Sequence, residues 1–445
     1  MAPRRRTVLA AVSTATASAV AGCAGFLTDE TSGDDGDEPA AATDVATALV
    51  EDLANERFER ASERFRSDQR SRYGDPGRLE RLWLALTTTG GSFEEIRGTS
   101  VTEGQQLRAV EVTAAFERGD HDCTVVVDGE SRVRNYGLSD EYERPSYVDP
   151  DAITTRSVTL SVPDCSLPGT VTTPAEGDGV PGVVLVHDDG PMTADTPRGG
   201  TKTFADLAEG LATEGVATLR YDKRVPACEV APEAYTLDRV TVDDAAVAIE
   251  RLRNVDGVDP DRIVVAGHGL GGRAAPRIAN RDGDLAGVVG LAAPARPYPE
   301  FTFSQLEYKT SVGTHEWADL TATYEAWGDE IDRVRAGEYE PAERLLGKPG
   351  AFWDSIGSYD HLETAAETDV PVLLCQGERD FQVSASDALE QWDGAFAGAT
   401  TVETYAALNH LFMPGEGEPV AVAYAVRNNV DEAVVDDVAT WVRGL

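Results

Sequence analysis

The amino-acid sequence predicts an α/β protein whose main domain contains a doubly wound, mostly parallel sheet, preceded by a small α+β domain. After Ile153, short apolar runs rich in β-branched residues alternate with helical patterns, which is typical of parallel strands covered by helices on both faces. Before that point, helical patterns come first and alternating patterns follow, which indicates helices beside antiparallel strands. The 445 residues, 41% of them hydrophobic, suffice for two to three domains.

The first residues have the pattern of an export signal. Three arginines at positions 4–6 precede a weakly apolar run, and the segment ends at Cys23. This resembles a twin-arginine signal with a lipobox over residues 1–22, which implies that Arg5 and Arg6 direct export and that Cys23 is lipidated. The protein is then expected on the outer face of the cell membrane, attached to the lipid bilayer as a lipoprotein. A frayed basic N-terminus with a chance cysteine is the alternative.

An acidic, disordered tether is expected at residues 23–43, which are rich in Gly, Asp and Glu. Such a composition cannot bury a core. No run of about 18 apolar residues occurs in the chain, so no transmembrane helix is expected.

The whole chain is strongly acidic, with 78 Asp and Glu against 39 Lys and Arg and a formal net charge of −39. Nucleic acid is excluded as a partner, because phosphate recognition needs a basic surface. The basic residues are almost all arginine, and only four are lysine, namely Lys202, Lys223, Lys309 and Lys348. An acidic, lysine-poor surface resembles that of proteins from halophilic archaea, whose hydrated carboxylates keep them soluble in salt. A merely acidic secreted protein is the alternative.

The small domain is expected over residues 44–144. Helical patterns, the second opened by Pro76, precede alternating runs at 107–116 and 123–127. This order resembles the cone-shaped, nuclear-transport-factor-2-like domains of unknown function that precede some exported hydrolases. No catalytic constellation is apparent there, and His121 is expected to be solvated at a turn.

The main domain is expected over residues 151–445. Its predicted strands are the short apolar runs 158–162, 182–186, 217–221, 262–266, 285–291 and 370–375. Residues 296–368 break the alternation with an aromatic, helical stretch. We expect this stretch to form a cap over the sheet.

A strand, a glycine turn and a helix meet at Gly267-His268-Gly269-Leu270-Gly271-Gly272. This resembles the nucleophile elbow of the α/β-hydrolases, G-x-S-x-G, with Gly269 where the family has serine. The loops that contain Asp380 and His410 follow in the family's chain order, which implies that they are the triad acid and base. Glu378 is a weaker candidate for the acid.

The oxyanion loop resembles the segment His187-Asp188-Asp189-Gly190-Pro191. The resemblance implies that the oxyanion donors are the N–H of Leu270 and an N–H at about Asp188–Asp189. Asp188 stands where the family has glycine, and its carboxylate would oppose developing negative charge.

The resemblance implies a serine hydrolase of esterase or peptidase type that acts on a small-molecule ester or peptide. Without a serine at position 269, this activity is expected to be weak or lost, although His410 and Asp380 could still activate water. The alternative is a cell-surface pseudoenzyme that binds a ligand or acts as a scaffold. A dinucleotide fingerprint, G-x-G-x-x-G, also overlaps the elbow, but the next strand ends without the acidic residue that binds the ribose.

No cofactor is expected, and no metal, because neither His187 nor His268 has a partner at metal-ligand spacing. The remaining cysteines, Cys123, Cys165, Cys228 and Cys375, form no C-x-x-C motif. Disulfides among them and buried free thiols are both open.

Overall fold

The computed structural model describes residues 38–104, 106–312, 320–392 and 394–445. The export signal, Arg5, Arg6, Cys23 and most of the expected tether lie outside these residues. The first described helix, α1 (Glu38–Ala54), already starts at Glu38, so the end of the expected tether is helical. None of the helices in the described ranges is long and apolar enough to span a membrane.

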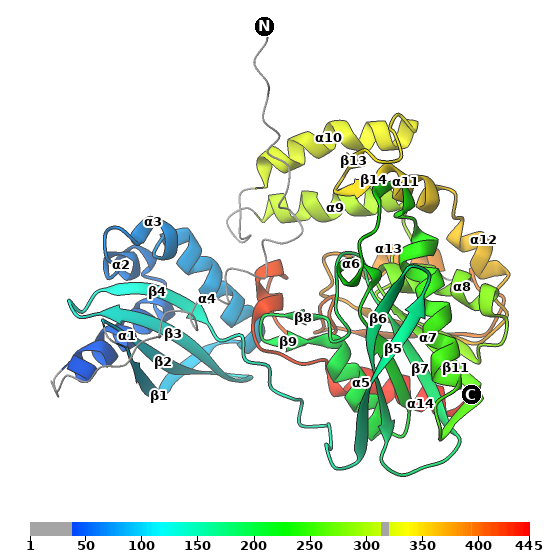
Figure 1. Cartoon of the computed structure of the whole chain (residues 1–445). Coiled ribbons are helices and arrows are strands. Elements are labelled where there is room, and N and C mark those ends of the chain that lie inside the picture. Colours follow the sequence, from blue (N-terminus) through cyan, green and yellow to red (C-terminus); the bar gives the residue numbers. More distant parts are fainter. Residues whose placement is uncertain (1–37, 105, 313–319, 393) are drawn as a thin grey trace, which may run out of the picture.

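The small domain packs its helices against one antiparallel sheet (Figure 1). The helices are α1, α2 (Phe58–Glu63), α3 (Arg70–Tyr73) and α4 (Pro76–Gly90). The strands follow in chain order across the sheet: β1 (Phe93–Glu103), β2 (Leu107–Phe116), β3 (Gly119–Asp128) and β4 (Val133–Leu138). Asp75 caps α4 by accepting the N–H of Arg78, and Pro76 occupies the first turn, where no donor is needed.

The expectation for His121 was wrong. Its side chain is not solvated but 7% exposed, because it lies within β3 and its ring contacts that of Phe116 at 5.5 Å between centroids. Burial lowers the pKa of His121 to about 4, with the nearby Arg427 as the next contribution.

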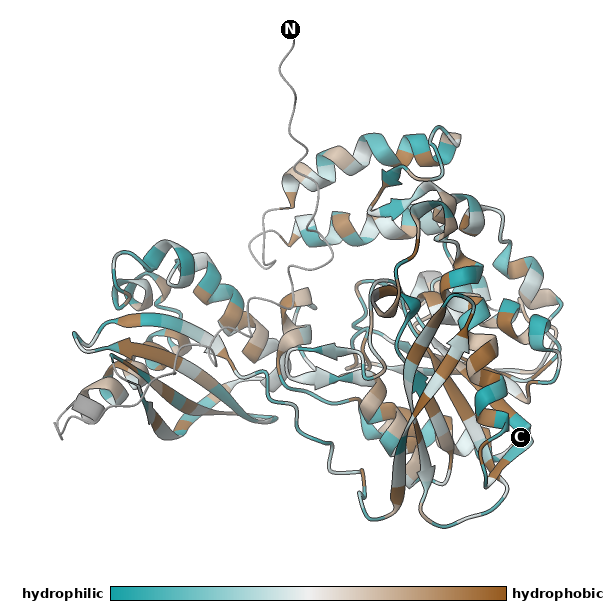
Figure 2. Ribbon diagram, viewed as in Figure 1, coloured by the Kyte–Doolittle hydropathy of each residue, from teal (hydrophilic) through white to brown (hydrophobic). Residues whose placement is uncertain are grey.

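The main domain is built on an eight-stranded sheet of order β16-β15-β12-β11-β7-β10-β6-β5. Its strands are β5 (Ile153–Val162), β6 (Cys165–Pro174), β7 (Val180–Val186), β10 (Ala217–Tyr221), β11 (Val258–His268), β12 (Gly287–Leu291), β15 (Val372–Gly377) and β16 (Thr400–Tyr405). The six from β16 to β10 run parallel, whereas β6 and β5 pair antiparallel at one edge. The strands β7, β10, β12 and β15 are buried almost throughout, and hydrophobic residues, in brown, lie along the sheet in Figure 2.

Helices cover both faces of this sheet. The helices α5 (Thr203–Thr213) and α14 (Glu432–Arg443) share one apolar core with it, and α7 (Asp243–Arg253) and α8 (Leu270–Asp282) share the other. Helical residues also form α6 (Arg224–Ala227), η2 (Pro232–Ala234), η3 (Asp238–Val242), α12 (His361–Ala366) and α13 (Ala385–Trp392), and short strands form β8 (Pro197–Arg198) and β9 (Thr201–Lys202).

A cap lies beyond one end of the strands (Figure 1), within the expected range 296–368. It contains α9 (Tyr298–Ser311), α10 (Thr321–Ala336), the pair β13 (Arg344–Leu345) and β14 (Lys348–Pro349), and α11 (Gly350–Gly357). Its aromatic side chains pack on one another and on the main core; Tyr298, for example, contacts Phe301 and Phe352.

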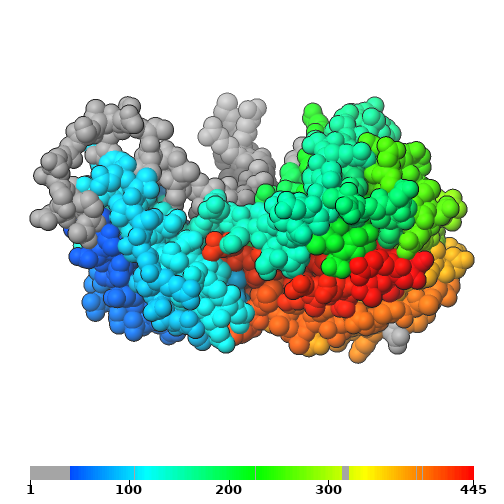
Figure 3. All heavy atoms as spheres, turned by 90° about the horizontal axis from the view of Figure 1, so that it is seen from below, coloured from blue at the N-terminus to red at the C-terminus, as the bar shows by residue number. Residues whose placement is uncertain are grey.

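The two domains share part of a core. The turn η5 (Ala421–Ala425) contacts α4, and Val420, Val422 and Val426 belong to the apolar cluster of the small domain. In Figure 3 an orange-red segment from the C-terminal part of the chain lies against the cyan surface of the small domain. The guanidinium of Arg427 donates to the carbonyl of Asp120 at 2.6 Å. The chain that follows the candidate histidine is therefore fixed by the other domain.

One disulfide joins Cys165 to Cys228, with 6.2 Å between their Cα atoms. Cys123 and Cys375 are buried free thiols. Both possibilities left open by the sequence therefore occur.

Candidate active site

The elbow between β11 and α8 has the geometry of a nucleophile turn. Gly269 has φ 52° and ψ −115°, a conformation that side chains rarely adopt. The neighbouring glycines permit close packing: a Cβ on Gly267 would lie 2.3 Å from the backbone of Gly271, and one on Gly271 would lie 2.4 Å from the carbonyl oxygen of Val186. The fold thus keeps the strained turn although no nucleophile stands there.

The structure brings His410 and Asp380 together as the sequence suggested. Nδ1 of His410 lies 2.7 Å from Oδ2 of Asp380, and the His410 side chain is 2% exposed. The other oxygen of Asp380 accepts the backbone N–H groups of Gln382 and Val383 at 2.8 and 2.9 Å. The amide of Gln376 donates to the carboxylate as well, so the acid is firmly held.

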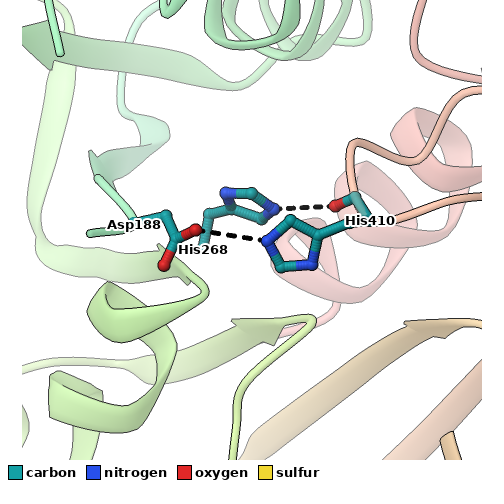
Figure 4. Close-up of side chains that lie close together, drawn as sticks. All are labelled: Asp188, His268 and His410. Atoms are coloured by element: carbon teal, nitrogen blue, oxygen red, sulfur yellow. Dashed lines mark hydrogen bonds and ion pairs between the residues drawn. The ribbon is translucent and has the colours of Figure 1, made fainter. Parts of the chain in front are cut away.

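Asp188 lies between the elbow and the histidine (Figure 4). Its Oδ1 accepts the N–H of Leu270 at 2.7 Å, and its Oδ2 lies 3.2 Å from Nε2 of His410. A Cβ on Gly269 would lie 1.9 Å from Oδ1 of Asp188. The carboxylate therefore fills the place where a nucleophilic side chain would begin, and it occupies one expected oxyanion donor.

The two carboxylates change the charge of the histidine. Burial disfavours the imidazolium, but the negative charges of Asp380 and Asp188 and their hydrogen bonds raise the pKa of His410 to about 9. Burial likewise opposes ionisation of Asp188, yet the hydrogen bond and charge of His410 hold its pKa well below the usual range. The two carboxylates thus favour the protonated form of His410, and this form cannot act as a base.

The other two histidines near the elbow have structural contacts. Nε2 of His268 donates to the carbonyl of His410 at 2.8 Å, because a carbonyl can only accept. Burial lowers the pKa of His268 to about 4 and that of His187 to about 3. The ring of His187 packs against Phe204 at 4.9 Å between centroids. Both histidines are uncharged at neutral pH.

Two of the four lysines meet at the oxyanion loop. Nζ of Lys348, in the cap, lies 2.5 Å from Oδ1 of Asp189, and Nζ of Lys223 donates to the carbonyl of Asp188 at 2.5 Å. Oδ1 of Asp189 also accepts the N–H of Gly190. No sequence motif predicted that these lysines lie at the site. Lysine is scarce in the chain, and this could have drawn attention to each of the four.

A cavity of about 330 Å³ lies between the cap helix α9 and the loop that contains Asp380. Its wall includes Arg296, Phe301, Tyr308, Phe381 and Gln382. The ring of Phe381 stacks on Tyr308 at 4.7 Å. The cavity therefore combines aromatic and polar groups directly beside the candidate acid.

Comparisons with known proteins agree with this architecture. Residues 46–135, in the small domain, match a family model described as a protein of unknown function, DUF3887. Over 402 residues the chain is 32% identical to "Esterase EstD" of Thermotoga maritima, which covers 89% of this chain and 94% of that protein.

Solved structures found by comparison include Est1E from Butyrivibrio proteoclasticus, with 14% identity and a TM-score of 0.42 over 64% of this chain and 96% of that chain. Another is the hyperthermophilic esterase from the archaeon Pyrobaculum calidifontis, with 20% identity and a TM-score of 0.42 over 65% of this chain and 85% of that chain. With the identity to the Thermotoga maritima protein extending over both domains, the chain belongs to the α/β-hydrolase esterase family.

Proposed function

We propose that this protein is an exported, lipid-anchored member of the esterase family that binds a small ester or peptide ligand beneath its cap and does not perform serine-type acyl transfer. The observation that carries the proposal is the position of the Asp188 carboxylate, which lies where the side chain of a residue at position 269 would begin.

Acyl transfer by a serine hydrolase needs a nucleophile, a neutral histidine and free oxyanion donors. Gly269 supplies no nucleophile. His410 is protonated at neutral pH because its pKa is raised to about 9. The N–H of Leu270 is bonded to Asp188. None of the three requirements is met. Asp188 accounts for two of them, since it favours the protonated form of His410 and occupies the N–H of Leu270.

Ligand binding is supported by features that do not depend on the nucleophile. The cap, the cavity of about 330 Å³ and the stacked aromatic rings beside the acid loop are all present. The relative from Thermotoga maritima is called an esterase, which favours a small ester over a peptide. A cell-surface binding protein that retains this cavity is the form of the proposal that we favour.

The anchor is proposed from the sequence pattern alone. Arg5 and Arg6 would direct export, and Cys23 would hold the protein on the outer face of the membrane through its lipid. Replacing Cys23→Ser should move the protein from the membrane fraction to the medium. The large negative charge is consistent with a saline habitat, and all assays should therefore be run in concentrated salt.

The test is labelling by a fluorophosphonate probe together with hydrolysis of short-chain aryl esters. The wild-type protein should be neither labelled nor active. Gly269→Ser alone should also fail, because the new Cβ would meet Asp188. The double variant Asp188→Gly/Gly269→Ser places a serine at position 269, frees the N–H of Leu270 and removes one of the two carboxylates beside His410. It should be labelled. Labelling of the wild-type protein at any serine, or of Gly269→Ser alone at full rate, would contradict the proposal.

A further inference from the structure

Asp188 does more than block the elbow, because it adds a carboxylate beside two buried histidines (Figure 4). One potential ligand atom from each of Asp188, His268 and His410 lies within 4.8 Å of the other two. A carboxylate and two imidazoles are ligands that zinc takes in open, catalytic-type sites, with water in the fourth position. We propose that Asp188, His268 and His410 bind one divalent transition-metal ion, with Zn²⁺ as the preferred ion.

The spacing of the first two ligands already suits a metal. Oδ2 of Asp188 and Nε2 of His410 are 3.2 Å apart, and two tetrahedral ligands at about 2.0–2.1 Å from zinc are roughly 3.3 Å apart. A ring nitrogen of His268 would have to approach by at most about 1.5 Å to complete the set.

Each ligand also has the outer partner that orients metal ligands in proteins. Nδ1 of His410 is bonded to Asp380 at 2.7 Å, which leaves Nε2 toward Asp188. Nε2 of His268 donates to the carbonyl of His410, so Nδ1 carries the free lone pair. The N–H of Leu270 donates to Oδ1 of Asp188 at 2.7 Å and leaves Oδ2 as the single ligand atom.

The charges around the cluster favour a cation on balance. Asp188 and Asp380 both face His410, so two carboxylates lie beside the proposed ion. Lys223 is the nearest opposing charge, since its ammonium bonds to the carbonyl of Asp188. The charge of Lys348 is offset by its ion pair with Asp189.

The metal site and the proposed function share Asp188 and His410, but the two proposals have separate tests. Labelling of the double variant Asp188→Gly/Gly269→Ser tests whether the wild-type protein has lost acyl transfer. Metal titration of the wild-type protein tests the metal site. Either proposal can fail while the other stands.

The experiment uses the full chain, freed of metal by dialysis against a chelator and kept in concentrated salt. Zn²⁺ is titrated in competition with a chromophoric chelator, and Co²⁺ is added separately to record its visible spectrum. We expect one tight site per chain and the intense Co²⁺ bands of a four-coordinate nitrogen and oxygen site. Asp188→Asn and His268→Asn should each weaken Zn²⁺ binding by about 100-fold or more.

Lys348→Met/Asp189→Asn is the matched control, because it removes the neighbouring ion pair without changing the net charge beside the cluster, and it should leave the Zn²⁺ affinity unchanged. Asp380→Asn removes only the outer partner of His410 and should weaken binding by about 10–100-fold. Circular dichroism identifies any variant that does not fold, and in that case the Co²⁺ spectrum of the wild-type protein decides. Absence of a tight site, equal affinity in Asp188→Asn, or only the weak bands of six-coordinate Co²⁺ would overturn the proposal.

Discussion

A Cβ atom on Gly269 would lie 1.9 Å from Oδ1 of Asp188, so the Asp188 carboxylate can keep its position only while residue 269 has no side chain. The glycine at the elbow and the aspartate on the neighbouring loop are therefore one coupled feature rather than two separate departures from the family pattern. The adjacent strands β7 and β11, which run parallel, bring these loops together.

The coupling gives a prediction for stability. Gly269→Ala should destabilise the protein by about 3 kcal/mol, because a methyl group at positive φ would also collide with the carboxylate. Asp188→Gly in the same chain should recover most of the loss and leave about 1 kcal/mol of backbone strain. Denaturant unfolding of the two single variants and the double variant checks this, and purely additive losses would show that the two residues are not coupled.

The cap should depend on the ion pair between Lys348 and Asp189, whose atoms are 2.5 Å apart. Lys348→Met removes the charge, and with it the contact of Nζ with the ring of Phe352 at 5.7 Å, but keeps an unbranched side chain. We expect faster proteolysis within the cap and a loss of about 1–3 kcal/mol, since Asp189 would remain partly buried without its counter-ion. The double variant Lys348→Met/Asp189→Asn should recover part of this loss. If Lys348→Met alone is as resistant as wild type, the pair does not hold the cap.

Acid should loosen the small domain through His121. Its pKa is lowered to about 4 in the folded protein, against about 6.5 in the unfolded chain. The folded state therefore binds fewer protons, and the stability present above pH 6.5 is lost as the pH falls toward 4, by at most about 3 kcal/mol. Arg427 and Arg118 disfavour the charged ring, whereas Asp120 and Asp122 favour it.

Thermal unfolding at a series of pH values from 7 to 5 measures this dependence. His121→Gln removes the titrating ring, so the decline across this range should be shallower than in the wild-type protein. Parallel profiles for the two proteins would assign the acid sensitivity to other groups.

The disulfide between Cys165 and Cys228 should be an important source of stability. It closes a loop of sequence separation 63, for which the chain-entropy estimate is about 4 kcal/mol. Unfolding with and without reductant, and in Cys165→Ser/Cys228→Ser, should show this loss. An unchanged midpoint under reducing conditions would mean that the bridge is absent from the protein in solution.

The parts of the site that depend on local sequence motifs could be predicted. The glycine turn around Gly269 and the loops of Asp380 and His410 each follow a buried strand or stand in a recognisable segment, and parallel strands bring such loops to the same edge. The hydrogen bond from the N–H of Leu270 to the Asp188 carboxylate could not be predicted, because the two residues are 82 positions apart. The contact also requires that position 269 has no side chain.

The same limit explains what was missed. The three residues of the proposed metal site lie on three separate segments, namely the end of β11 and two loops, so no spacing within one segment could reveal them. His121 was misjudged because a turn was expected at its position, whereas the hairpin starts earlier at Gly119 and places the ring under the sheet. The apolar run at η5 gave no sign in the sequence that it would pack against the other domain.

Because of the apolar turn η5, the two domains should not fold well as separate proteins. Val420, Val422 and Val426 complete the core of the small domain, yet they follow His410 by only a short stretch of chain. Cutting the protein at the linker before Asp151 would expose part of the apolar core of the small domain in one fragment. In the other fragment it would expose the apolar turn that follows His410. Gene fusions or domain swaps should therefore transfer both halves together, and natural recombination at this linker would be selected against.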